Sequence, residues 1–136
     1  PEPENSQLAQ VSVQHWAAAA LARGRAGLAE GDDNCVNDPA VVSLRRKVSP
    51  KPNLSLTRDA AKLTIETKDG KRIKEQVIHC LGSAERPMTD DQLSTKFLDQ
   101  AGTVLNRREA ELLLAKCWSL ENHASFSEIF SARVSH

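Results

Sequence analysis

The sequence predicts an α+β fold, with a small antiparallel sheet built on a hairpin at about residues 61–80, packed by helices and followed by a helical C-terminal segment. Two observations predict this class. Apolar residues recur at three- and four-residue spacing before residue 50 and after residue 88, as on one face of a helix. Between these stretches the spacing changes to two, as in a strand with one solvated face. We therefore expect an α+β domain at 1–87 and a helical segment at 88–136.

The N-terminal part is predicted to begin with a helix from Gln7 to Arg23, ended by Gly24. The run of alanines at 17–20 favours a helix strongly, and glycine readily adopts the left-handed conformation that ends one. The residues on its apolar stripe are Leu8, Val11, His15, Ala18, Ala19 and Ala22. We expect this stripe to pack against the rest of the domain.

A second helix is predicted to begin at Pro39. Asp38 can cap it, and a proline in the first turn loses no hydrogen bond. The residues of its buried edge are Val41, Leu44 and Val48. We expect this helix to end shortly before Pro50, because proline cannot continue a helix.

A hairpin follows, with its turn at Asp69-Gly70. Alternation of apolar and polar residues predicts its strands, whose inward positions are Ala61, Leu63 and Ile65, then Ile73, Val77 and His79. Asp-Gly is typical of a two-residue type I′ loop, since both positions of that loop need positive φ. Two strands alone are marginally stable. We therefore expect a third strand, at 46–49 or 55–57, or a covering helix.

The last part of the chain is predicted to be helical. Capping boxes, in which Ser, Thr or Asn is followed three residues later by Glu or Gln, mark three helix starts. The pairs are Thr89 with Gln92, Asn106 with Glu109, and Ser125 with Glu128. The apolar residues expected to be buried behind them are Leu93, Phe97, Leu98, Ala101, Ala110, Leu113, Leu114, Cys117, Leu120, Phe126, Ile129 and Phe130.

Charge is balanced over the 136 residues, with 18 basic and 18 acidic side chains. Proteins that bind nucleic acids or acidic membranes rely on a positive excess, so we expect neither partner. Aromatic residues make up 4% of the chain, which also argues against a surface that stacks bases. The segment 45–76 is locally basic, with ten basic and four acidic residues. This pattern is typical of a solvated hairpin face, and a basic docking surface is the alternative.

Cysteine use and the start of the chain bear on where the protein works. Cys35, Cys80 and Cys117 are too few and too widely spaced for a disulfide framework, and none forms a CxxC pair. The longest apolar stretch, 16–22, is much shorter than the roughly 20 residues that span a bilayer. We expect a cytoplasmic protein with no membrane segment. The acidic, proline-rich start without methionine suggests the cut end of a longer chain.

The sequence lacks familiar catalytic and metal-binding motifs. No histidine has another four residues away and none lies in HExxH, so we expect no metal site. His15 lies on the apolar stripe of the first helix, where it is either a core or interface histidine or a residue that lines a cleft. His79 and Cys80 are neighbours in a predicted strand and point to opposite faces, so they cannot form a catalytic pair. We assign no catalytic residue and no cofactor.

Five segments taken in order resemble a known family. They are Gln7 to Gly24, Asn37 to Val48, Ile65 to Gly70, Gly82 to Thr89, and Leu93 to Phe97. Their order and spacing resemble the C-terminal part of the 2-methylcitrate dehydratase (MmgE/PrpD) family, which also contains cis-aconitate decarboxylase and iminodisuccinate epimerase. The resemblance extends from about Pro3 to Phe130. Relatives tend to place an aromatic residue before the serine at position 12, where this chain has Val11, so the branch of the family stays open.

The resemblance implies a lid-like α+β domain, followed by helices that return to a large helical domain upstream in the enzyme. The active sites of the family lie in the cleft between those two domains. Their aspartate, histidine and lysine residues come mainly from the helical domain or from the segment just before the lid. None of those positions exists in this sequence, so we carry over no catalytic residue. Ser12 and His15 are the nearest to that cleft and are candidates for lining it.

The implied reaction is proton abstraction next to a carboxylate of a small polycarboxylate, followed by loss of water, loss of carbon dioxide or inversion. The resemblance also implies a homodimer that needs no metal or organic cofactor, and this chain alone is expected to be inactive. The alternative is a non-catalytic interaction module that binds a protein partner through its helical tail. The residues that would supply its apolar face are Phe97, Leu113, Leu114, Phe126 and Phe130.

Overall fold

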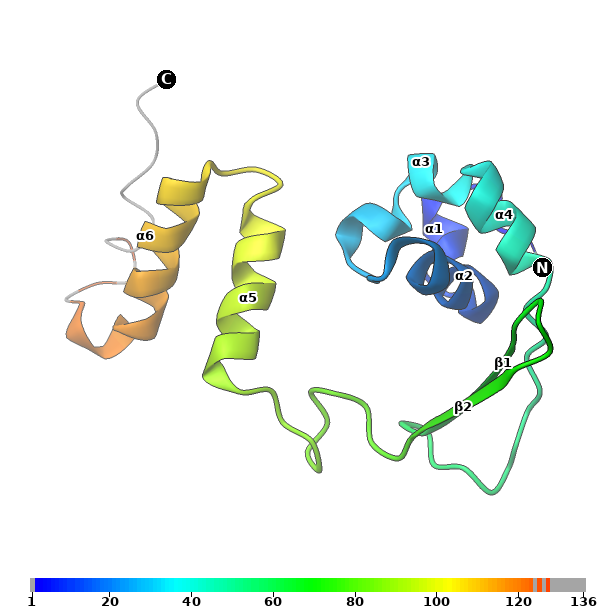
Figure 1. Ribbon diagram of the computed structural model, residues 1–136. Coiled ribbons are helices and arrows are strands. Elements are labelled where there is room, and N and C mark those ends of the chain that lie inside the picture. Colours follow the sequence, from blue (N-terminus) through cyan, green and yellow to red (C-terminus); the bar gives the residue numbers. More distant parts are fainter. Residues whose placement is uncertain (1, 124, 126, 128–136) are drawn as a thin grey trace. The chain divides into compact units, whose positions relative to one another are not determined.

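The computed structural model describes residues 2–123, 125 and 127 of the chain (Figure 1). It confirms the predicted α+β class, with helices, a two-stranded antiparallel hairpin and then two longer helices. Backbone contacts divide the chain into two compact units, residues 1–55 and residues 56–136. Compactness alone does not define the domains of a family, so the predicted boundary at residue 87 stays a prediction.

Unit 1 (residues 1–55) consists of short helices around a small core. Its elements are α1 (Ser6–Ala9), α2 (Val13–Arg23), the 3-10 helix η1 (Leu28–Gly31), α3 (Asp33–Val36) and α4 (Pro39–Arg45). The buried core consists of Ala18 and Ala19 from α2, Cys35 from α3 and Val41 from α4, with Leu44 packed against them. Since the distance between packed helices depends on the side chains at their contact, the two alanines allow α4 to lie close to α2.

The prediction of one continuous helix from Gln7 to Arg23 is wrong at its N-terminal end, because α2 begins only at Val13. Ser12 is extended, with φ −94° and ψ 105°, and its Oγ accepts a hydrogen bond from the His15 N–H at 3.2 Å. This is the geometry of an N-cap, which starts a new helix. The predicted stripe is divided as a result. His15, Ala18 and Ala19 are fully buried, whereas Leu8, Val11 and Ala22 are exposed.

The predicted C-terminal end of α2 and the predicted start of α4 are confirmed. Gly24 ends α2 in the left-handed conformation, with φ 72°. The Asp38 carboxylate caps α4 by accepting the Ala40 N–H at 2.8 Å. However, α4 ends at Arg45, well before Pro50. The Val48 N–H donates to the Arg45 carbonyl at 3.1 Å, so the chain leaves the helix through a tighter turn and not through the proline.

The hairpin of unit 2 (residues 56–136) is formed by β1 (Ala61–Glu66) and β2 (Arg72–Val77). Their antiparallel register places Ile65 opposite Ile73 and Ala61 opposite Val77. The predicted two-residue turn is wrong. The Thr67 N–H donates to the Lys71 carbonyl at 2.9 Å, so the loop consists of the three residues 68–70, and its last residue, Gly70, has φ 81°. A left-handed glycine in this position is typical of three-residue hairpin loops.

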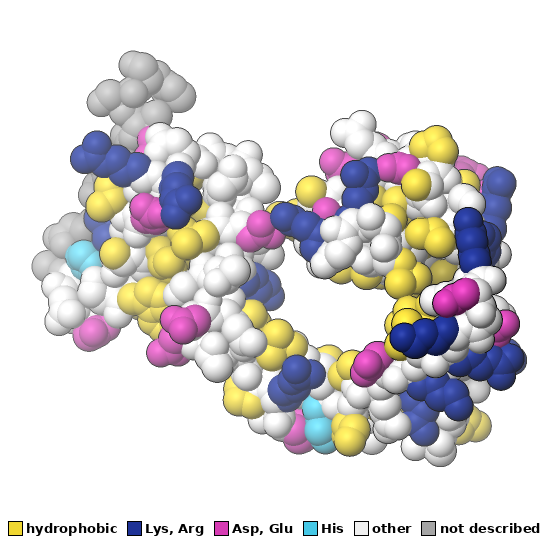
Figure 2. Space-filling view, in the orientation of Figure 1, with side chains coloured by type: hydrophobic (Ala, Val, Ile, Leu, Met, Phe, Trp, Pro, Cys, Tyr) yellow, Lys and Arg dark blue, Asp and Glu magenta, His cyan; other side chains and the backbone are white. Residues whose placement is uncertain are grey.

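The two faces of the hairpin differ in chemistry. Residues directly opposite each other in a sheet share a face, so one face carries Ala61, Leu63, Ile65, Ile73, Glu75 and Val77. The other face carries Lys62, Thr64, Glu66, Arg72, Lys74 and Gln76. Figure 2 shows basic side chains gathered over the hairpin. Within the described residues the sheet has two strands, so the predicted third strand is wrong. The apolar side chains Leu63 and Ile73 remain 42% and 38% exposed.

The C-terminal part of unit 2 is a helix pair, α5 (Asp90–Ala101) and α6 (Arg107–Trp118), followed by the short η2 (Leu120–Asn122). The capping boxes at the starts of α5 and α6 are confirmed. The third predicted box depends on Glu128, which lies outside the described residues, as do Phe126, Ile129 and Phe130.

The helix pair buries fewer apolar residues than the sequence predicts. Ala110 is buried, and Phe97, Leu98, Ala101, Leu113 and Leu114 are half-buried. The prediction of burial is wrong for Leu93, Cys117 and Leu120, which are exposed. One seam between two helices covers a single stripe on each, so apolar residues off that seam stay in contact with solvent.

The three-residue loop predicts the effect of substitutions at Gly70. A Cβ at this position meets no atom within 4 Å, so Gly70→Ala acts only through the cost of a positive φ. We expect the hairpin to lose about 1 kcal/mol, which speeds amide hydrogen exchange in β1 and β2 about fivefold. Gly70→Asn is the matched control, because asparagine tolerates the left-handed conformation better. Equal exchange rates in the two variants would contradict the loop geometry.

Candidate functional site

His15 of α2, one of the two residues predicted to line a cleft, is fully buried inside unit 1. Its Nε2 lies 2.7 Å from the backbone carbonyl of Glu30, and its Nδ1 lies 3.4 Å from Nη1 of Arg45. A carbonyl only accepts and a guanidinium only donates, so these partners require a hydrogen on Nε2 and a lone pair on Nδ1. The imidazole is therefore held in one neutral tautomer by two partners from different parts of the unit.

Arg45 connects His15 to the C-terminal end of α3. The side chain is buried, and its Nη1 also donates to the Val36 carbonyl, at 3.1 Å. Its Nε is buried and has no hydrogen-bond partner among the described residues. Nη1 of Arg45 thus contacts both the Val36 carbonyl and His15, and the three residues join α2, α3 and α4.

Glu30 completes the network through its side chain. Its carboxylate accepts hydrogen bonds from the Gly27 N–H at 2.8 Å and from Nε of Arg25 at 3.1 Å. The Gly27 N–H, and then the Arg25 guanidinium, hold the pKa of the Glu30 carboxyl below its usual value. These bonds fix the backbone of η1, and so the carbonyl that accepts from His15.

Ser12 is half-buried and caps α2, as described above. Both predicted cleft residues thus have structural tasks within unit 1, and the burial of His15 is what the core alternative predicts. Their predicted position at a cleft between two domains stays a prediction, because such a cleft is not part of this structure.

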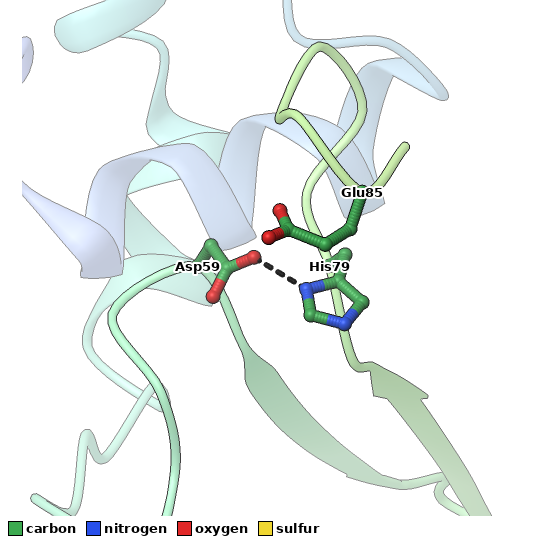
Figure 3. Close-up of side chains that lie close together, drawn as sticks. All are labelled: Asp59, His79 and Glu85. Atoms are coloured by element: carbon green, nitrogen blue, oxygen red, sulfur yellow. Dashed lines mark hydrogen bonds and ion pairs between the residues drawn. The ribbon is translucent and has the colours of Figure 1, made fainter. Parts of the chain in front are cut away.

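A second polar cluster lies at the open end of the hairpin, where Asp59, His79 and Glu85 come together (Figure 3). Nδ1 of His79 lies 2.7 Å from Oδ2 of Asp59. One potential ligand atom from each of the three residues lies within 4.8 Å of the others. Asp59 and His79 are half-buried, and Glu85 is exposed.

The hairpin register brings the first two of these residues together. Ala61 pairs with Val77, and Asp59 and His79 lie two residues outside this pair, just before β1 and just after β2. The last pair of the hairpin therefore brings the two segments that carry them side by side. Hydrogen bonds from His79 and then from the Thr57 hydroxyl hold the pKa of the Asp59 carboxyl below its usual value.

A turn returns the third residue to the cluster. The Gly82 N–H donates to the Arg86 carbonyl at 2.8 Å, and the Ser83 N–H donates to the Cys80 carbonyl at 3.1 Å. Glu85 lies within this closed turn, and its carboxylate is directed toward Asp59 and His79 (Figure 3). Sequence reasoning singled out neither Asp59 nor Glu85, because they fit no local motif.

The order of elements defines the structural class of the protein, an α+β module of short helices, one hairpin and a helix pair. The chain belongs to the MmgE/PrpD C-terminal domain family, whose model matches residues 1–120. The match includes every helix of unit 1, the hairpin, α5 and α6, and it confirms the resemblance predicted from the sequence. No curated protein matches the chain. Within the described part of the chain, no helix combines the length and the apolar character needed to cross a membrane.

The buried network predicts that His15 is needed for stability. His15→Ala removes a buried side chain and leaves Arg45 and the Glu30 carbonyl short of a partner, so we expect the free energy of unfolding of unit 1 to fall by about 3 kcal/mol. His15→Gln keeps an amide donor and should recover part of this loss. Ser12→Ala, which removes only the cap, should lose about 1 kcal/mol. Urea unfolding followed by circular dichroism measures all three, and an unchanged His15→Ala variant would contradict the network.

The Glu30 contacts predict a loss of stability in acid. The folded state lowers the pKa of this carboxyl below its ordinary 4.5, so its contribution is present above that pH and is lost as the pH falls through the folded-state value. Glu30→Gln lacks the charge and should be less stable than the natural chain by about 1 kcal/mol at pH 6, with the difference closing as the pH falls below 4.5 and through the folded-state pKa. Glu4→Gln, an exposed change in the same unit, is the control. A difference that stays constant with pH would show that the charge of Glu30 has no role.

Proposed function

We propose that the chain is the lid-domain portion of an MmgE/PrpD-like enzyme that acts on a small polycarboxylate. The candidates are a 2-methylcitrate dehydratase-like lyase, a cis-aconitate decarboxylase and an iminodisuccinate epimerase. The observation that carries this proposal is the match of the C-terminal domain model to residues 1–120. In this proposal the catalytic residues belong to an upstream helical domain, and the complete enzyme is a cytoplasmic homodimer.

The internal structure of unit 1 is compatible with the work of a lid. A lid excludes water from a reacting substrate and so strengthens the electrostatic interactions inside the closed site. It performs this task as a preformed body with internal hydrogen bonds of its own. The buried contacts of His15, Arg45 and Glu30 provide that internal bonding, and they leave the chemistry to residues of the partner domain.

The charge of the hairpin also fits a polycarboxylate. One face of the hairpin carries exposed Lys62 and Lys74, beside Arg72, which pairs with Glu66 at 2.9 Å. A cluster of positive charge raises the local concentration of a multiply charged anion. In this proposal the reaction is proton abstraction next to a carboxylate, followed by loss of water, loss of carbon dioxide or inversion, and the lid binds and encloses the anion without transferring the proton.

The alternative, a non-catalytic interaction module, depends on an apolar face of the helical tail. Phe97, Leu113 and Leu114 are half-buried in the helix pair, and Phe126 and Phe130 lie outside the described residues. Other apolar residues of the helix pair, among them Leu93, Leu112 and Trp118, are exposed and would be the surface that this alternative uses. The family match over residues 1–120 is the observation that favours the lid.

An activity assay distinguishes the two functions. The purified chain is incubated with 2-methylcitrate, cis-aconitate and iminodisuccinate, alone and together with the helical domain of an MmgE/PrpD protein from the same organism. We expect no turnover by the chain alone or by the helical domain alone, and turnover of one of the three substrates by the mixture. Turnover by the chain alone, or a mixture no more active than the helical domain, would overturn the proposal.

A further inference from the structure

We propose that Asp59, His79 and Glu85 form a binding site for one divalent transition-metal ion at the open end of the hairpin. The three side chains come from three different places: the turn before β1, the residues after β2, and the turn at 80–86. Their potential ligand atoms lie within 4.8 Å of one another. The proposed site lies in unit 2, apart from the His15 network, and does not depend on the proposed lid function.

The ligand set indicates the kind of ion. An imidazole nitrogen with two carboxylate oxygens suits Zn²⁺, Co²⁺ and similar first-row ions, whereas Ca²⁺ and Mg²⁺ prefer sites built from oxygen alone. Three protein ligands leave at least one coordination position for water. Bond lengths near 2.1 Å place the ligand atoms about 3.4 Å apart in a tetrahedral site. Asp59 and His79, whose atoms lie 2.7 Å apart, would separate slightly to reach this spacing, and rotation of the exposed Glu85 side chain would close the remaining distance.

Two of the three ligands are already positioned without the ion. Nδ1 of His79 faces both carboxylates and is bonded to Asp59 at 2.7 Å (Figure 3). Because a carboxylate only accepts, the Nδ1 atom holds the hydrogen in this state. Metal binding replaces that hydrogen: the proton passes through solvent to Nε2, and the Nδ1 lone pair binds the ion. The metal-bound ring carries its one hydrogen on Nε2.

The consequence of binding is a cross-link at the base of the hairpin. The ion would join the turn before β1 to the turn after β2, and a ligand that binds only the folded state stabilises it by mass action. A hairpin of two strands is marginally stable. Within the described residues this sheet has two strands, and its apolar residues Leu63 and Ile73 remain partly exposed, so a cross-link at its base would add stability. In this proposal the bound ion orders the hairpin.

The test is a metal titration with the thiols controlled. Cys80 and Cys117 are exposed and free, and thiolates bind the same ions. The chain carrying Cys80→Ser and Cys117→Ser is titrated with zinc chloride by calorimetry and with Co²⁺ by absorption spectroscopy. We expect one ion per chain, a Co²⁺ spectrum without thiolate bands, and slower hydrogen exchange in β1 and β2 after zinc is added.

Variants of the ligands make the test specific. Glu85→Gln is the most informative, because it leaves the bond between His79 and Asp59 in place and yet removes one charged ligand; we expect its zinc affinity to fall about tenfold. His79→Ala and Asp59→Asn should each lose at least as much. Glu75→Gln, which removes an exposed carboxylate from β2, is the matched control and should bind as before.

Three results would overturn the proposal. The first is the absence of saturable zinc binding by the cysteine-substituted chain. The second is Glu85→Gln and His79→Ala variants that bind as tightly as the parent. The third is a Glu75→Gln variant that loses as much affinity as Glu85→Gln, which would show that general negative charge attracts the ion.

Discussion

The hydrogen bonds of the buried His15 side chain are the interaction on which unit 1 depends. An imidazole and a guanidinium inside a protein are destabilising unless their polar atoms are bonded. His15 meets this requirement by donating to the Glu30 carbonyl and accepting from Arg45, which also donates to Val36. One side chain thus joins α2 to η1 and α4. The apolar core around it consists mainly of small side chains, so this polar network supplies much of the specificity of the packing.

These hydrogen bonds give His15 a structural role in the core of unit 1. The family resemblance places the segment around Ser12 nearest the cleft, which is what makes Ser12 and His15 candidates for lining it. In the structure the ring nitrogens of His15 are both occupied by structural partners, and Ser12 holds the start of the same helix. With such an interior, unit 1 can move as one body, a property that suits its part in the proposed lid.

Local features of the fold were predictable and non-local ones were not. The caps at Asp38, Thr89 and Asn106 use residues within one helical turn, so their sequence signal is self-contained. Arg45 was not singled out, because its contacts with His15 and Val36 join separate helices. The break at Ser12 was missed because the strong helix propensity of the following alanines masked the cap.

The length of the hairpin loop determines whether Asp59 and His79 come together. A two-residue loop at Asp69-Gly70 would place Ile65 opposite Lys74, whereas the three-residue loop places it opposite Ile73. The apolar alternation of the two strands favours the second register, because a slip of one residue turns every side chain of one strand to the other face. Only that register brings Asp59 opposite His79. Glu85 depends in addition on the closed turn at 80–86, which no local pattern in the sequence indicates.

The most direct test of this account is the tautomer of His15 in the folded chain. Long-range correlation of the ring protons with the ring nitrogens by NMR, on ¹⁵N-labelled protein at neutral pH, identifies which nitrogen carries the hydrogen. We predict a hydrogen on Nε2 that exchanges slowly with solvent and an Nδ1 that accepts a hydrogen bond. A hydrogen on Nδ1, or a ring that exchanges rapidly with water, would contradict the claim that His15 is a structural residue of the core.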